Sequence, residues 1–209
     1  MKEEYMLPGE IEQRSFELIG QELGGRKFPP EQEPIVKRVI HTTADFDYAD
    51  NLVFSPGAVE TALEALKKGA HIVTDTQMAM AGINKGALQK LGITAHCFMS
   101  DPDVAREAVK NGTTRAAASM RRAAELSGRL IFAVGNAPTA LMELKKLIDG
   151  KIVCPVLVIG VPVGFVNVVE SKELIVESDV PHIVARGRKG GSNVAAAVCN
   201  ALLYMAGGR

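Results

Sequence analysis

Short apolar runs separated by segments of helix length are the feature that most restricts how this chain can fold. The runs at 130–134 (LIFAV) and 156–159 (VLVI) contain no alternating polar residue, which is typical of strands buried on both faces. Further apolar runs lie at 52–54, 71–74, 94–99 and 182–185. The sequence therefore predicts an α/β fold over residues 1–209, a single doubly wound domain whose mostly parallel sheet has about five to six strands, with helices on both faces.

Polar, glycine-rich turns follow these strands, and ligands of doubly wound sheets bind beyond the carboxyl ends of the strands. We therefore expect the turns to form a pocket rim, and they lie at 55–57, 75–77, 135–139, 160–164 and 187–193. Segments 135–139 and 187–192 also open helices, whose first backbone N–H groups favour a carboxylate or another anion. For 187–192, an ordinary connection with solvated charges is the alternative.

A helix predicted from Glu31 to about Thr43 carries the candidate acid or base. An apolar stripe runs through it from Ile35 to Ile40, and Arg38 and His41 lie one turn apart on a neighbouring face. A cation beside an imidazole lowers the pKa of the imidazole, which suits a group that gives or takes a proton near neutrality. The alternative is a solvated histidine near a helix end.

Ser15 is an unusual residue in the helix predicted over 11–23. It falls within the apolar stripe, four residues after Ile11. A serine there commonly replaces alanine and bonds to the carbonyl of the preceding turn. The other interpretation is that its hydroxyl lines a pocket.

Composition and motifs exclude several classes of protein. Lys plus Arg and Asp plus Glu both number 24, which gives no electrostatic basis for binding nucleic acid or a membrane surface. No window approaches the length of a transmembrane helix, and three scattered cysteines are typical of reduced thiols in a cytoplasmic protein. The chain lacks GxGxxG, GxxxxGK[ST], CxxC and HExxH patterns, so we expect neither a nucleotide cofactor nor a bound metal.

Seven segments taken together resemble the precorrin-8X methylmutase family of cobalamin biosynthesis, which includes the cobalt-precorrin-8 enzymes. They occur in the family's order over nearly the whole chain: 11–16 (IEQRSF), 39–41 (VIH), 54–58 (FSPGA), 74–78 (TDTQM), 134–141 (VGNAPTAL), 160–166 (GVPVGFV) and 187–192 (GRKGGS). No single segment is decisive, but their joint occurrence is specific.

The resemblance implies an isomerase that moves a methyl group from C-11 to C-12 of precorrin-8 or its cobalt form, giving hydrogenobyrinic or cobyrinic acid. His41 matches the family's proton donor or acceptor. Ser15 and Arg38 match substrate-binding residues, and Arg115 matches a further one. The resemblance also implies no cofactor, a polycarboxylate tetrapyrrole as substrate, and a homodimer whose pocket is shared between subunits.

Two other functions remain open at this stage. A non-catalytic tetrapyrrole carrier would use the same pocket without turnover. A tetrapyrrole methyltransferase dependent on S-adenosylmethionine would need a glycine-rich cofactor loop after an early strand, which this sequence lacks. The sequence does not indicate whether the substrate holds cobalt.

Overall fold

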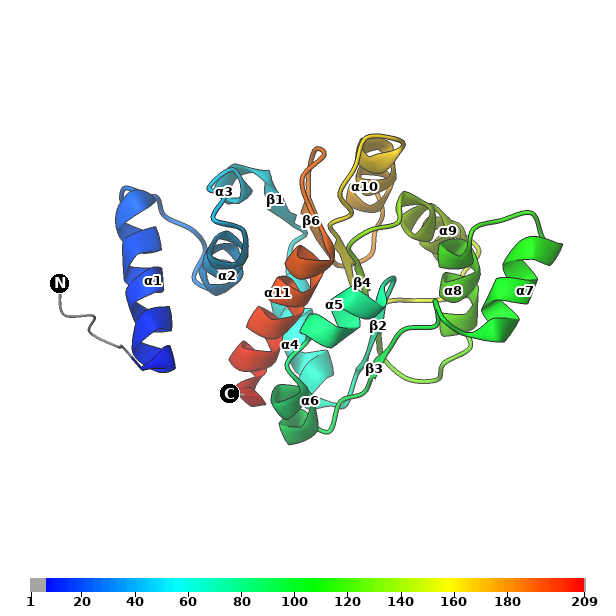
Figure 1. Cartoon of the computed structure of the whole chain (residues 1–209), viewed down its shortest axis with the longest axis horizontal. Helices are drawn as coiled ribbons and strands as arrows, with labels where there is room; N and C mark the ends of the chain where they lie inside the picture. Colours follow the sequence, from blue (N-terminus) through cyan, green and yellow to red (C-terminus); the bar gives the residue numbers. More distant parts are fainter. Residues whose placement is uncertain (1–6, 209) are drawn as a thin grey trace.

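A six-stranded sheet forms the centre of the computed structural model, which describes residues 7–208 (Figure 1). The order across the sheet is β1-β6-β5-β4-β2-β3, and every neighbouring pair is parallel except β1 with β6. The predicted α/β class and mostly parallel sheet are confirmed. The strands are β1 (Leu52–Phe54), β2 (His71–Thr74), β3 (Ala95–His96), β4 (Leu130–Val134), β5 (Leu157–Gly160) and β6 (His182–Ala185).

Apolar side chains cover both faces of this sheet. Successive residues of a strand point to opposite faces, so Ile131 and Ala133 join one apolar cluster and Phe132 and Val134 join the other. The first face packs against α2 (Glu33–Thr43), α4 (Ala58–Lys67), α5 (Gln77–Gly82), α6 (Lys85–Leu91) and α11 (Ser192–Leu203). The second packs against α8 (Arg115–Ala123), α9 (Pro138–Asp149) and α10 (Val168–Val176), while α7 (Pro102–Lys110) lies outside α8.

The first helix, α1 (Pro8–Glu22), lies at one end of the molecule beside α2 (Figure 1). Among the described residues of α1, the one buried residue is Ile19, which is 9% exposed, whereas Ile11 and Leu18 are about half exposed. The short helix α3 (Tyr48–Asn51) leads into β1, and a π-turn, η1 (Tyr204–Gly208), follows α11. None of the helices within residues 7–208 is both long and apolar enough to cross a bilayer.

The turn at 55–57 does not lie where the sequence predicted. Since β1 is antiparallel to β6, Phe54 pairs with Ile183 near the start of β6. The Ser55 hydroxyl accepts a hydrogen bond of 2.9 Å from the backbone N–H of His182. This turn is therefore at the amino edge of the sheet, opposite the expected pocket rim, and that prediction is wrong.

No sequence pattern described above predicted helix α10, which spans Val168–Val176 between β5 and β6. Ser171 and Lys172 are both fully buried, so polar residues stand on the buried face and interrupt the apolar period. The Nζ of Lys172 donates to the carbonyl oxygens of Gly187 and Lys189, both at 2.8 Å.

The buried Lys172 ammonium should make stability depend on alkaline pH. Burial lowers the pKa of Lys172 to about 8, so between this value and its ordinary pKa the unfolded chain binds more protons than the folded chain. The free energy of unfolding then rises with pH in that window. Urea unfolding of wild type and Lys172→Met, at about pH 8 and about pH 10, should show the wild type gaining stability relative to the variant. Equal changes in the two proteins would contradict the assignment.

Candidate active site

The carboxyl edge of the sheet is held together by Asp75, which follows β2. Its carboxylate accepts hydrogen bonds from the backbone N–H groups of Gly135 (2.8 Å), Asn136 (2.8 Å) and Ala137 (2.7 Å). Burial raises the pKa of Asp75, and the three N–H groups act in the opposite direction. The N–H groups just before α9 therefore do bind a carboxylate, as expected, and this carboxylate belongs to the chain itself.

The other strand exits meet the loop before α11. The backbone N–H of Gly191 donates to Val161 at 2.9 Å, and the hydroxyls of Thr76 and Ser192 are 2.8 Å apart. Four of the five expected rim turns, after β2, β4, β5 and β6, therefore do come together. Gly135 is needed here, because a Cβ on this residue would lie 2.7 Å from the carbonyl oxygen of Gly191.

Lys189 connects this edge to the turn that follows α2. Its Nζ lies 2.6 Å from a carboxylate oxygen of Asp45 and 2.6 Å from one of Asp47. His41 is in the last turn of α2, and Ala44 ends that helix in the left-handed conformation. The ion pairs thus hold the end of α2 that carries His41 beside the exit of β6.

Ser15 and His41 line the same hollow between α1 and α2. Its volume is about 310 Å³, and its walls are Ser15, Leu18, Ile19, Glu22, Ile40, His41, Ala44 and Phe46. The Ser15 hydroxyl also donates to the carbonyl oxygen of Ile11 at 2.8 Å. Both interpretations of Ser15 are therefore correct, because it bonds to its own helix and faces a cavity.

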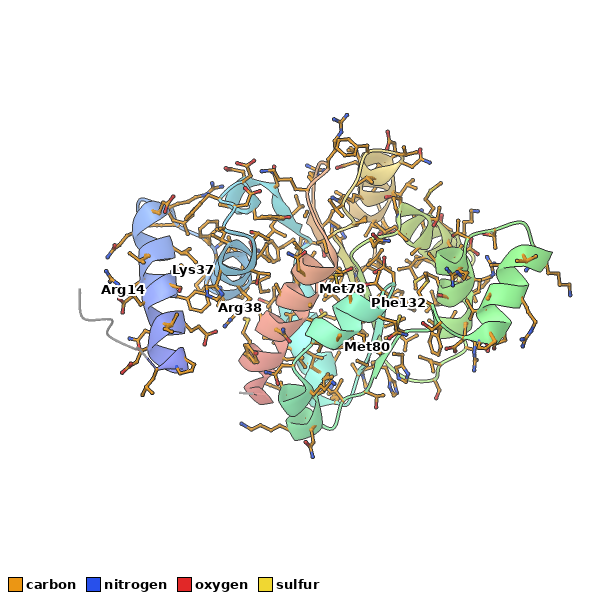
Figure 2. All side chains as sticks on the ribbon, in the orientation of Figure 1. Arg14, Lys37, Arg38, Met78, Met80 and Phe132 are labelled. Atoms are coloured by element: carbon orange, nitrogen blue, oxygen red, sulfur yellow. The ribbon has the colours of Figure 1, made fainter. Side chains whose placement is uncertain are left out.

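Arg38 reaches a second hollow of about 380 Å³ next to the first, lined by Phe16, Pro34, Lys37, Arg38, Ala201, Tyr204 and Met205. Figure 2 shows Arg38 below α2, in the space between α1 and α11. Its guanidinium forms an ion pair with Glu12 of α1 and lies 4.7 Å from the ring centre of Phe16 and 5.2 Å from that of Tyr204. The Phe16 ring also stacks on His41, with ring centres 5.2 Å apart.

The surroundings of His41 favour its neutral form. Partial desolvation of the ring lowers its pKa, and the positive charge of Arg38 lowers it further. At neutral pH the imidazole is therefore uncharged and can accept a proton. The predicted influence of Arg38 on His41 is confirmed, although desolvation is the larger cause.

Replacing Arg38 with methionine should raise the pKa of His41. The variant removes a positive charge beside the imidazole, which stabilises the imidazolium. An NMR titration of the His41 ring measures the shift. Arg14→Met is a matched control, because Arg14 pairs with Glu17 at 3.0 Å on the exposed side of α1. An unchanged His41 pKa in Arg38→Met would exclude the proposed charge effect.

Arg115 is not part of this arrangement within one chain. It begins α8 and is exposed. Helices α8 and α2 cover opposite faces of the sheet and are well separated in Figure 1. Of the four predicted site residues, the structure brings together Ser15, Arg38 and His41.

Sequence reasoning missed three residues around this group. Phe16 is adjacent to Ser15, so its position next to a candidate residue was an available signal. Glu12 and Tyr204 pack against Arg38 from positions 26 and 166 residues away along the chain (38 − 12 and 204 − 38). No local pattern indicates contacts over such separations.

Comparison with known proteins identifies the family. The family model described as precorrin-8X methylmutase matches residues 10–205. The chain belongs to the precorrin-8X methylmutase family. Two similar relatives, both named cobalt-precorrin-8 methylmutase, are 47% identical to it: that of Priestia megaterium covers 95% of this chain and 88% of its own length, and that of Salmonella typhimurium covers 94% and 95%.

A solved methylmutase structure has the same fold. The precorrin-8X methyl mutase of Thermus thermophilus superposes with a TM-score of 0.86 at 42% identity, over 94% of this chain and 97% of that one. The resemblance drawn from the seven sequence segments is therefore confirmed. As a methylmutase family member, the chain is a relative of isomerases of cobalamin biosynthesis.

Proposed function

We propose that this chain is an isomerase that moves the methyl group from C-11 to C-12 of precorrin-8 or cobalt-precorrin-8. The observation that carries the proposal is the match to methylmutases over residues 10–205, the segment that holds the hollow lined by Ser15 and His41. In this reaction the C-11–methyl bond breaks and the C-12–methyl bond forms, so substrate and product are isomers. No cofactor is needed to balance the step.

In this proposal His41 exchanges a proton with the macrocycle where charge develops during the shift. Arg38 binds a substrate carboxylate through the edge of its guanidinium, and Ser15 contributes a hydroxyl to the same cavity. Holding a large substrate in one geometry supplies much of the rate enhancement when little covalent chemistry is required. The neutral imidazole and the adjacent cation support these roles.

We further infer that residues 1–209 form a single domain and that two copies of the chain form a cytoplasmic homodimer. Support for a shared pocket comes from the exposed apolar side chains of Ile11 and Leu18 on α1 and of Leu7 just before it, and from the position of Arg115 across the sheet from His41. In a dimer, Arg115 would serve the pocket of the partner subunit. The free thiols of Cys97, Cys154 and Cys199 support a reducing compartment.

Spectra of the purified protein mixed with cobalt-free and with cobalt-containing precorrin-8 test the proposal. We expect the spectrum of one or both substrates to change to that of the corrin product without any addition. Binding without product would indicate the carrier. Turnover that requires S-adenosylmethionine would indicate the methyltransferase. The same spectra determine which form of the substrate the protein uses.

A further inference from the structure

We propose that Phe16 is a positioning residue that fixes both His41 and Arg38 through a single aromatic ring. The catalytic consequence of this inference rests on the proposed function, whereas the geometric part does not. Phe16 belongs to α1, and the two residues it contacts belong to α2. One side chain of the first helix would therefore orient the two reactive groups of the second.

The contacts form a continuous series of rings and one cation. The rings of Phe16 and His41 are stacked, with centres 5.2 Å apart and planes inclined by 28°. The guanidinium carbon of Arg38 lies 4.7 Å from the centre of the Phe16 ring and 5.2 Å from that of Tyr204. Three separate elements, α1, α2 and η1, thus contribute to one assembly.

Stacking determines which atoms of the Arg38 guanidinium and the His41 imidazole remain available for hydrogen bonds. A guanidinium that lies over an aromatic ring uses its face there and keeps its edge N–H groups for carboxylates. In the structure that edge binds the carboxylate of Glu12. A nearly parallel imidazole likewise keeps its two nitrogens at the perimeter of the stack. Phe16 therefore restricts the directions in which Arg38 can bind a carboxylate and His41 can exchange a proton.

Helix α2 alone cannot impose these directions. His41 is exposed in the last turn of the helix, and Arg38 is a long flexible side chain one turn before it. Ordering such a side chain costs rotamer entropy, which a packed neighbour must offset. Phe16, half-buried and packed against the main apolar cluster, is the ring that contacts both.

The alternative is that Phe16 only fills space between α1 and the core. Any apolar side chain of similar volume would then serve equally well. The charged groups around His41 are Arg38 on α2 and Glu22 of α1, which lines the same hollow, while Asp45 of the following turn is paired with Lys189. A substitution at Phe16 changes none of these charged groups. A shift in the pKa of His41 therefore measures the contribution of the aromatic ring.

Phe16→Leu tests the inference, with Phe16→Tyr as the conservative rescue. We expect Phe16→Leu to lower kcat by about 10-fold to 100-fold, the scale of a small misplacement of reacting groups. NMR titration of His41 should show its pKa rising, because leucine leaves the imidazole more hydrated. Phe16→Tyr keeps the ring and should retain the wild-type kcat and His41 pKa.

Phe28→Leu is the matched control. Phe28 is also half-buried, packs against the same apolar cluster and lies beneath an arginine, with Arg26 5.2 Å from its ring centre. We expect this variant to keep the wild-type kcat and His41 pKa. Thermal unfolding of all three variants shows how much stability each substitution costs.

Two results would overturn the inference. One is a Phe16→Leu protein with the wild-type kcat and His41 pKa. The other is a Phe16→Tyr protein whose kcat falls as far as that of Phe16→Leu. If the wild type converts neither form of precorrin-8, the proposed function fails instead. The titration of His41 needs no substrate, so it still decides whether Phe16 positions the imidazole.

Discussion

The His41→Ala protein should bind the tetrapyrrole and lose its turnover. A positioned acid or base typically contributes about 10²-fold to 10⁴-fold to a rate, so we expect kcat to fall by that order. Binding should persist, because Arg38 and the other residues that line the two hollows are unchanged. Spectra of the substrate mixed with excess protein measure binding and conversion in the same sample.

His71→Ala is the control for this experiment. His71 begins β2 at the amino edge of the sheet, and its ring lies 3.1 Å from that of His96 on the edge strand. This substitution should leave conversion unchanged. Conversion by His41→Ala at the wild-type rate would show that His41 is not the proton-exchanging group.

The Asp75→Ala protein should be strongly destabilised. The substitution leaves the backbone N–H groups of Gly135, Asn136 and Ala137 without their acceptor, and the first of these is buried while the other two are partly buried. The unsatisfied buried N–H of Gly135 alone should lower the free energy of unfolding by about 1–3 kcal/mol, and the two partly buried groups should add to this loss. Urea unfolding monitored by circular dichroism measures this loss.

Asp103→Ala provides the comparison for Asp75. Asp103 is exposed in the first turn of α7, where a carboxylate interacts with the helix dipole for about 0.3–1 kcal/mol. If Asp75→Ala lowered the free energy of unfolding by a similarly small amount, water would have replaced the carboxylate at the three N–H groups. In that case Asp75 would not hold the exits of β2 and β4 together.

Much of the fold could be predicted from the sequence, because local patterns determine it. The apolar runs at β4 and β5 and the apolar stripe of α2 were placed to within about two residues. Where polar residues are buried by distant partners, the local pattern fails. Lys172 is satisfied by carbonyls 15 and 17 residues away, and this concealed α10.

Part of the candidate site could be predicted, because some of its features are local in the sequence. The spacing of Arg38 and His41 on one helix is a local property, and so is the apolar stripe that contains Ser15. The pairing of Asp75 with the N–H groups of residues 135–137 spans about sixty positions, and no spacing rule indicates it. The structure nevertheless explains why the segments TDTQM and VGNAPTAL occur together in this chain, since the first supplies the acceptor and the second the donors.

The contact between Arg38 and Tyr204 has a consequence for the order of events during protein synthesis. Ser15, Arg38 and His41 are translated well before α11, which packs along α2, and before Tyr204, which follows Arg38 by 166 positions. Contacts between such distant parts of a chain form late in folding. A nascent chain therefore carries Ser15, Arg38 and His41 without the ring of Tyr204, and the pocket is completed only after that residue has left the ribosome.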